Sequence, residues 1–468
     1  MTKNKKMGAS RALIPTIFAL AWPTMLEQLM QTAVQYIDVA MVGTLGTEAT
    51  AAVGSTTTVN WLIGSTVSAI SVGFLAFVSQ AMGAGEREKV KRASSQAVLA
   101  VIICGIFFTA LTLILSPYVP VWMQVDEKIC SLASKYFFIL YTPMLFRCAS
   151  IIFGTLFRAS GDTKTPMLVG IAVNLTNVIL NFFMIYPTRE VEIFSARITI
   201  VGAGLGVIGA AMASAISFAV GGIIISVALW RSAELSPRGY SIRPDREVLG
   251  RCLRVAAPNA LQRFGTSLGY VAFAAMVNSL GDISTAAHTI ANTVESAFYI
   301  PGYGMQTAAA TLAGNAYGAR DAKKLRELSR TILLIEVMLM IISGGLLFVF
   351  APNMMTLFSK DTEVIELGTK VLRMVALSEP FYGVSIIIEG MMQGLGKTSM
   401  PFVTNVIGMW GIRIVGTFIC INIYSLGLVS AWACMILHNL MLFAVFSTYF
   451  AMGRWDPMRK KKKENTVA

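Results

Sequence analysis

One aspartate and three asparagines are the polar side chains of this chain whose types and spacing best suit ion chemistry. Asp38 lies in one apolar segment, and Asn174, Asn177 and Asn181 lie in a later one. Spacings of three and four residues put the three amides on one face of a helix. Polar groups are expensive in hydrocarbon unless they face a cavity or one another. We therefore predict that Asp38 and this stripe form a cation- or proton-binding site, which Ser214 completes.

A proline precedes the aspartate by fifteen residues, about 22 Å along a helix. Pro23 removes one backbone hydrogen bond and permits a kink in the first apolar segment. A carboxylate that can change charge and a helix that can bend are the two parts of an ion-driven switch, so Pro23 is the predicted hinge. Two structural readings stay open, in which amides merely cap Asp38 or the stripe merely joins helices through hydrogen bonds.

Other charged or polar residues interrupt apolar segments and are candidates for a substrate cleft. Glu27 follows Pro23 by one helical turn and stands 235 positions before Gln262. An ionisable residue within a membrane span is a functional candidate by default. The cleft candidates are Glu27, Gln262, Arg263, Glu295 and Glu379. Structural salt bridges are the alternative for all of them.

The composition says which kind of protein positions these groups. Of 468 residues, 55% are hydrophobic and only 13% are charged, and the mean hydropathy is +0.66. Soluble domains carry about 25% charged residues, so this is a membrane protein. A membrane-spanning helix needs about 20 apolar residues. The predicted spans are 13–43, 50–82, 94–116, 135–157, 166–187, 203–230, 252–280, 284–316, 330–351, 368–394, 401–424 and 427–452.

The two halves of the chain repeat each other at the same constant spacing that separates Glu27 from Gln262. Matched pairs are Pro23 and Pro258, Met41-Val42 and Met276-Val277, Gly83-Ala84 and Gly318-Ala319, Gly161 and Gly396, and Pro166 and Pro401. Six spans in each half give both halves the same orientation. The prediction is an all-α polytopic membrane protein with twelve transmembrane helices in two parallel-repeat six-helix lobes around a cleft, as in many secondary transporters.

Turn residues and charges divide the chain into predicted parts. These are an N-terminal lobe (1–230), a cytoplasmic linker (231–254), a C-terminal lobe (255–455) and a basic cytoplasmic tail (456–468). The first half has fourteen extra residues around Pro187–Thr199, and their alternating character predicts a hairpin on the outer side.

Lysine and arginine are distributed unevenly between the two sides of the predicted bundle. With both termini cytoplasmic, 28 of the 38 lie in inside segments, 7 in outside loops and 3 within spans. The positive-inside rule therefore predicts a multi-pass chain in the cytoplasmic (inner or plasma) membrane with both termini inside. The formal net charge of +13 belongs to this bias and argues against a nucleic-acid partner. The Arg459–Lys463 run faces anionic lipid or is a simple stop-transfer cluster.

Patterns of enzymes and nucleotide-binding proteins find no support in the sequence. Six cysteines without a C-x-x-C pair and two histidines do not indicate a zinc or disulfide framework. Gly204-x-Gly206-x-x-Gly209 has no βαβ context, and Gly396-Lys397-Thr398 lacks the first glycine of a phosphate loop. We predict a protein that is not an enzyme, has no cofactor, and is driven by an ion gradient.

Several longer motifs occur together in this chain. In the first half they are Trp22-Pro23, Asp38-x-x-Met41-Val42-Gly43, Arg158-Ala159-Ser160-Gly161-Asp162-Thr163-x-x-Pro166 and Asn174-x-x-Asn177-x-x-x-Asn181. In the second half they include Ala286-Ala287-His288-x-Ile290-Ala291, Pro301-Gly302-x-Gly304 and Gln393-Gly394-x-Gly396-Lys397-Thr398-x-x-Pro401. With these motifs the chain resembles the multidrug and toxic compound extrusion (MATE) transporters over nearly its whole length.

The resemblance implies two six-helix lobes and antiport of drugs against cations by alternating access. It matches Asp38 to the family's first-helix aspartate and Pro23 to its kink proline. Many members carry an aspartate where this chain has Asn181. Sodium-coupled NorM-type members also carry an acid in the seventh helix, whereas residues 252–280 contain none. By this comparison, a sodium site in the C-terminal lobe would need Glu295 or Glu379.

The resulting prediction is a multidrug efflux antiporter that is coupled to protons or sodium. Its substrates are amphipathic and often cationic small molecules, its surroundings are membrane lipid, and it is a monomer. Sodium at Asp38 is the one metal site considered. A lipid-linked precursor flippase of the same superfold is the main alternative, and a passive channel or a receptor-like binding protein is a further one.

Overall fold

The computed structural model describes residues 2–123, 126–193 and 196–459. The first half contains α1 (Thr2–Gly43), α2 (Thr47–Gly83), α3 (Arg87–Leu115), α4 (Val119–Trp122), α5 (Glu127–Tyr141), α6 (Met144–Ser160), α7 (Lys164–Met184), β1 (Pro187–Ile193), β2 (Ala196–Ala203) and α8 (Gly206–Arg231). The second half contains α9 (Arg246–Asn278), α10 (Asp282–Phe298), α11 (Ile300–Gly318), α12 (Ala322–Phe358), α13 (Thr362–Ala376), α14 (Glu379–Gly394), α15 (Ser399–Ile407), η1 (Gly408–Ile414), α16 (Val415–Phe418), η2 (Ile419–Ile423) and α17 (Leu428–Ala451).

Twelve helical units correspond to the twelve predicted spans. Within the described residues, eight helices are long and apolar enough to cross a bilayer, and two bent pairs bring the number to ten. The pairs are α5–α6, bent by 49°, and α13–α14, bent by 55°. The two remaining units are α9 and α10–α11, which include polar residues such as Arg263 and Glu295. The fold is an all-α membrane protein of two six-helix lobes, as the sequence predicted.

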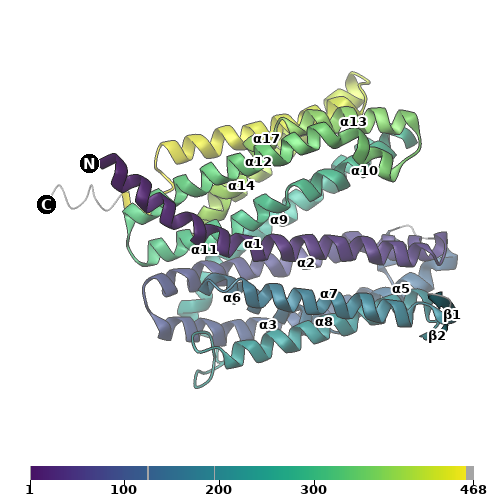
Figure 1. The fold of residues 1–468 in the computed structure, drawn as a ribbon, viewed down its shortest axis with the longest axis horizontal. Coiled ribbons are helices and arrows are strands. Elements are labelled where there is room, and N and C mark those ends of the chain that lie inside the picture. The colour runs from purple at the N-terminus through teal and green to yellow at the C-terminus, as the bar shows by residue number, and fades with distance from the viewer. Residues whose placement is uncertain (1, 124–125, 194–195, 460–468) are drawn as a thin grey trace.

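The units form two layers that correspond to the two halves of the chain. Helices α1 to α8 form one layer and α9 to α17 the other (Figure 1). We call them the N-lobe and the C-lobe. Several helices begin at an aspartate whose side chain accepts a hydrogen bond from a first-turn N–H group, which is a preferred helix start. These residues are Asp126 before α5, Asp245 before α9, Asp321 before α12 and Asp361 before α13.

Two helices cross from one lobe to the other. The first part of α1, with Ile17 and Leu20, packs in an apolar cluster with α11, α12 and α17, whereas Val42 near its end belongs to the N-lobe core. In the same way, Cys252 near the start of α9 packs in the N-lobe core and Phe273 packs in the C-lobe. The repeated prolines, Pro23 and Pro258, lie between these contacts on their respective helices.

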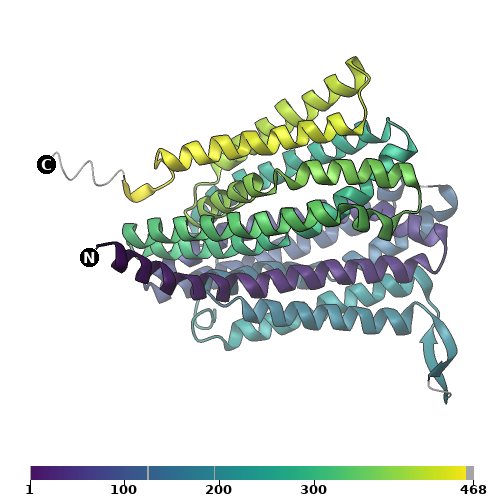
Figure 2. The same ribbon diagram turned by 45° about the horizontal axis from the view of Figure 1, so that its top comes forward.

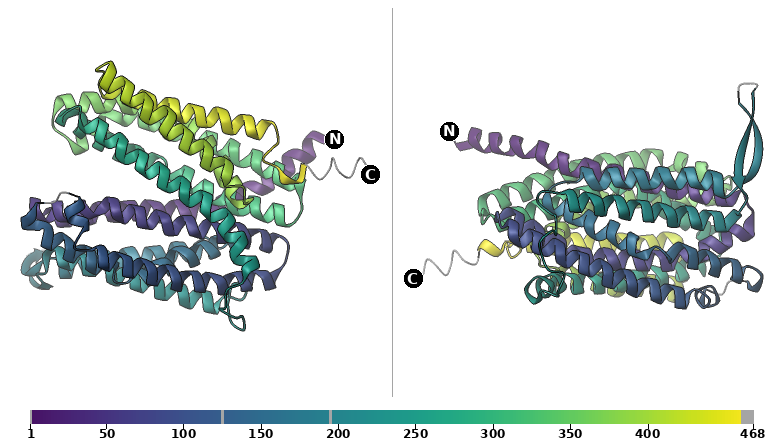
Figure 3. Two further views of the ribbon diagram at one scale, coloured as in Figure 1. Left: turned by 180° about the vertical axis from the view of Figure 1, so that it is seen from behind. Right: turned by 90° about the horizontal axis from the view of Figure 1, so that it is seen from below.

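The remaining connections mark the two ends of the molecule. Strands β1 and β2 form the predicted antiparallel hairpin, with Arg189 opposite Ile200. The hairpin projects beyond the helices at the end opposite the start of α1 and the end of α17 (Figures 2 and 3). The predicted linker, 231–254, is irregular only between Arg231 and Arg246, and its remainder forms the first turns of α9. Of the predicted tail, residues 460–468 lie outside the described part.

Candidate functional site

The N-lobe brings four of the predicted ion-site residues together. Asn181 donates to the carboxylate of Asp38 at 2.6 Å. With its amide nitrogen turned towards α1, Asn177 also donates to this carboxylate at 2.7 Å, and its oxygen accepts from the Ser214 hydroxyl at 3.0 Å. Asn177 and Asn181 are buried, whereas Asp38 and Ser214 are half-buried. One hydrogen-bond network around this carboxylate thus joins α1 and α7 directly and reaches α8 through Asn177.

The helical register of α7 explains this arrangement. Asn177 and Asn181 are four residues apart and therefore lie one above the other on the face that packs against α1. Asn174 continues the stripe by another turn but is only half-buried, and it donates no hydrogen bond to another described side chain. The site therefore consists of Asp38, Asn177, Asn181 and Ser214, and Asn174 lies at its margin.

The chemistry of this site is that of one compensated negative charge. Two amide N–H groups stabilise an ionised carboxylate. Amide groups can also turn their oxygens towards a cation, and a carboxyl group can take up a proton. A half-buried carboxylate remains reachable from outside the lobe, so a proton or one monovalent cation can exchange here.

Glu27 is not free to bind a substrate cation in this structure. Its carboxylate accepts from the guanidinium of Arg158 at 3.1 Å, across α1 and α6. The backbone oxygen of Arg158 accepts from Thr311 of α11 at 3.0 Å, which joins the N-lobe to the C-lobe at this point. The predicted cleft residue is therefore one half of an ion pair beside the interface between the lobes.

Three carboxyl groups lie deep in the C-lobe rather than beside Asp38. Glu295 of α10 is 4% exposed and accepts from the Tyr299 hydroxyl at 2.6 Å. Glu336 of α12 and Glu379 of α14 are fully buried, and among the described residues neither has a hydrogen-bond partner. Glu379 lies within electrostatic range of both other carboxyl groups. Each needs a compensating proton or cation, although no three His, Cys, Asp or Glu side chains in the described part are arranged to hold a metal ion.

A further carboxylate of the C-lobe, which is not among the predicted cleft residues, is surrounded by amides. Glu389 of α14 accepts from Gln262 of α9 at 2.9 Å, from Gln393 at 3.3 Å and from Asn405 of α15 at 3.3 Å. Its signal in the sequence was an acid within an apolar span, and the three amides around it are widely scattered along the chain. Arg263, next to Gln262, lies within electrostatic range of this carboxylate.

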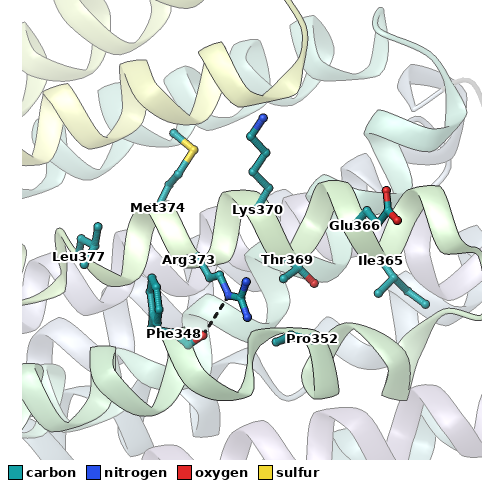
Figure 4. Close-up of a pocket in the computed structure, with 9 residues that line it drawn as sticks. All are labelled: Phe348, Pro352, Ile365, Glu366, Thr369, Lys370, Arg373, Met374 and Leu377. Carbon is teal, nitrogen blue, oxygen red and sulfur yellow. Dashed lines mark hydrogen bonds between the residues drawn. The ribbon is translucent and has the colours of Figure 1, made fainter.

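A groove on the described surface lies elsewhere, in the C-lobe. It has a volume of about 620 Å³ between α12 and α13, and its wall includes Phe348, Pro352 and Arg373 (Figure 4). Because proline has no N–H group, it leaves the carbonyl of Phe348 without a helical donor, and Arg373 donates to this carbonyl at 3.4 Å. The shape of the groove therefore has a local cause. None of the predicted site residues lines the groove, so it is not the predicted ion site.

Comparison with known proteins places the chain in a family. The model of the MatE family matches residues 23–183 and 258–419, which are the corresponding parts of the two halves. The chain belongs to the MatE family. Members of this family are transporters, so the chain is a multi-pass membrane transporter and not an enzyme.

Individual relatives agree with the MatE assignment over nearly the whole chain. The chain is 26% identical to the probable multidrug resistance protein NorM of Thermotoga maritima, covering 94% of this chain and 92% of that protein. It is 23% identical to human multidrug and toxin extrusion protein 1, covering 96% of this chain and 76% of that protein. The fold is also that of a solved outward-facing multidrug resistance MATE family transporter, with a TM-score of 0.87 and 22% identity, covering 95% of this chain and 96% of the solved one.

The two halves of this MatE chain differ chemically at the position of the ion site. Phe273 is the repeat partner of Asp38, and the guanidinium of Arg413 lies over its ring at 4.2 Å. Arg413 belongs to the π-helical turn η1. A π-helical turn holds one residue more than an α-helical turn, so the C-lobe helix does not keep the helical register of the asparagine stripe on α7. Where the N-lobe has a carboxylate with amides, the C-lobe has an aromatic ring with a fixed cation.

Proposed function

We propose that this chain is a multidrug efflux antiporter coupled to a proton or sodium gradient. The observation that carries the proposal is the half-buried carboxylate of Asp38, which accepts hydrogen bonds from Asn177 and Asn181. Asp38 lies on α1, and the first part of α1 packs against the other lobe. The names of the relatives support small-molecule drugs as the substrate class. We further propose that the substrates are amphipathic and often cationic, because a cation competes directly with the coupling ion for Asp38.

The packing of α1 supports a mechanism for the coupling. Asp38 bonds to α7 of the N-lobe, whereas Ile17 and Leu20, on the other side of Pro23, pack in the C-lobe. A proton or cation on Asp38 weakens its hydrogen bonds to the amides of α7. The outer part of α1 then moves relative to its inner part, with Pro23 as the hinge. Ion and substrate each favour the state that they bind more tightly.

The charge distribution supports an orientation in the membrane. The end with the start of α1 and the connection between α8 and α9 carries most of the lysines and arginines, so we place it in the cytoplasm of a cell with an inner or plasma membrane. The lobes touch at this end, through contacts such as Gln80 with the Gly394 carbonyl at 2.9 Å. In this orientation we infer a state closed towards the cytoplasm, and we propose that the protein is a monomer surrounded by lipid.

The test is efflux of a fluorescent cationic dye from proteoliposomes in which proton and sodium gradients are imposed separately. We expect Asp38→Asn to abolish gradient-driven efflux, because the amide keeps the shape of the site but cannot exchange a charge. Asp282→Asn, at an exposed aspartate of α10, is the matched control and should transport normally. Full coupled transport by Asp38→Asn would overturn the mechanism.

The same assay separates the alternatives. A passive channel would move dye without a counter-ion, and a flippase of lipid-linked precursors would move lipid but not dye. The relatives described above, named for multidrug resistance and toxin extrusion, favour the antiporter.

A further inference from the structure

One face of α13 carries an ordered row of exposed side chains that the antiport mechanism does not use. The row consists of Glu363, Glu366, Lys370, Arg373 and Leu377. Spacings of three and four residues place them on one side of the helix. From the start of α13, at the end of the molecule with the hairpin (Figure 1), the order is two acids, two bases and one apolar residue.

This row borders the groove between α12 and α13. Four of its members line the groove, namely Glu366, Lys370, Arg373 and Leu377 (Figure 4). Arg373 lies against α12, because its Nε atom donates to the Phe348 carbonyl and its guanidinium lies 5.5 Å from the centre of the Phe348 ring. Lys370 extends away from α12 (Figure 4). The groove therefore has an apolar floor and two cations at its rim.

The two bases lie where the apolar part of α12 ends. Phe348 is in the last turn of the span 330–351, and Arg373 reaches its carbonyl. Lysine and arginine at such a boundary keep their apolar stems in the hydrocarbon and extend their charged ends towards the headgroups. Leu377 is then at the depth of the acyl chains, and Glu366 is one turn further out than Lys370.

The charges of the row are not neutralised by neighbouring side chains. Among the salt bridges of the described residues, none includes Glu366, Lys370 or Arg373. The helix dipole favours acids near the start of α13 and bases near its end. This effect explains the signs of the charges, but it does not explain why two unpaired cations border a groove of about 620 Å³ at the edge of the hydrocarbon.

We propose that this groove binds one phospholipid whose headgroup carries a primary amine, of the ethanolamine type. Lys370 and Arg373 donate to the phosphate. Glu366 accepts from the headgroup ammonium, and an acyl chain lies along Phe348 and Leu377. A choline headgroup has no N–H group to donate to Glu366, and a glycerol headgroup has no positive charge to balance it. The order of charges along α13 therefore matches an ethanolamine headgroup.

The proposal goes beyond antiport and does not rest on it, because lipid binding is measured without transport. The experiment is native mass spectrometry of the purified full-length protein, titrated with ethanolamine, choline and glycerol phospholipids that have the same acyl chains. We expect the ethanolamine lipid to bind about three- to fivefold more tightly than the other two. Glu366→Gln should remove this preference without abolishing binding, because both bases remain.

Loss of both bases tests the phosphate contact. We expect the double variant Lys370→Gln and Arg373→Gln to bind all three lipids about tenfold more weakly. The matched control is Lys128→Gln with Lys135→Gln, which removes two exposed lysines from α5 of the N-lobe and should bind lipid as the unmodified chain does. Equal affinity of the unmodified chain for the three lipids, a preference that persists in Glu366→Gln, or equal losses in the two double variants would overturn the site.

Discussion

At the scale of single residues, the carboxyl groups within the helices of this chain have different surroundings. Asp38 and Glu389 are held by neutral amides, Glu27 is held by a guanidinium, and Glu336 and Glu379 have no described partner. The first arrangement leaves room for an exchangeable ion, because amides can turn. The second does not, because the chain provides the cation. The residue types around each acid therefore separate exchange sites from structural ones.

The ion pair between Glu27 and Arg158 provides a test of this distinction. Their side chains are 25% and 18% exposed, so either single change to glutamine leaves a charge poorly compensated. The double change copies the C-lobe, where Gln262 and Gln393 stand at these positions. We expect a coupling energy of about 1–3 kcal/mol in a double-mutant cycle of unfolding in mixed micelles.

An exposed pair serves as the control for this cycle. Lys89 and Glu86 are joined at 2.9 Å, but their side chains are 36% and 45% exposed. Solvent screening should reduce their coupling below about 0.5 kcal/mol. Equal coupling in both cycles would mean that burial of Glu27 and Arg158 has no energetic effect.

The contacts of Asp38 were predictable from the sequence, whereas those of Glu389 were not. A spacing of four residues between Asn177 and Asn181 defines one helix face, and a single aspartate in an apolar run needs polar partners. The amides around Glu389 come from three helices, and no periodicity connects them. Glu295 and Glu379 were predicted as cleft residues, and the structure places both among buried side chains of the C-lobe. The sequence could not give this placement, because an apolar run does not reveal which side of a helix faces the cleft.

At the scale of helices, the starts of α1 and α9 matter most, because each packs against the opposite lobe. The connection before α9 is bound to α3, since Gln96 donates to the Arg243 carbonyl at 2.9 Å and Ser95 donates to the Ser241 carbonyl. Asp245 caps α9 through the N–H groups of its first turn and pairs with Arg92 of α3. This segment carries the connection between the lobes, and these contacts fix it to α3. The repeat matches Pro23 with Pro258 in the sequence, but it did not predict that their helices cross between the lobes. It did not predict η1 either, because a π-helical turn has no periodic signal.

Acid should release the contact at Asp245. The hydrogen bond from Arg92 holds the pKa of Asp245 below its usual value. A carboxyl group with a lowered folded-state pKa stabilises the fold above its unfolded pKa, about 3.9, and loses this effect as the pH falls through the folded value. We expect protection of the Glu247 and Val248 amides from hydrogen exchange to be constant at neutral pH and to fall only below about pH 4.

Two variants divide the cap from the ion pair. Asp245→Asn keeps the cap but loses the charge, so its amide protection should no longer depend on pH in the acid range. Asp245→Ala loses both and should open the first turn of α9 by about 1 kcal/mol more. Acid-dependent protection that persists in Asp245→Asn would assign the effect to another group.

At the scale of the whole molecule, the lobes approach most closely where glycines remove the side chains between them. A Cβ atom on Gly83 of α2 would lie 2.0 Å from the Asn315 backbone oxygen, and one on Gly318 of α11 would lie 1.9 Å from the Gln80 backbone oxygen. Both contacts join the N-lobe to the C-lobe at the end that carries the start of α1 (Figure 1). Alternating access requires that this contact open, so these glycines set the balance between the two states.

A methyl group at this contact should therefore shift that balance. We expect Gly318→Ala to strain the closed end by about 1–3 kcal/mol, which moves the equilibrium about 5- to 150-fold towards the state open at this end. Spin labels at Glu86→Cys and Arg320→Cys, which are exposed positions on either side of the contact, would report the shift as a longer distance between the labels. Gly345→Ala is the control, because a Cβ atom there meets nothing within 4 Å. Identical distance distributions in Gly318→Ala and Gly345→Ala would mean that this contact does not affect the separation of the lobes. The equilibrium between the two states would then have to be set by α1 and Pro23 alone.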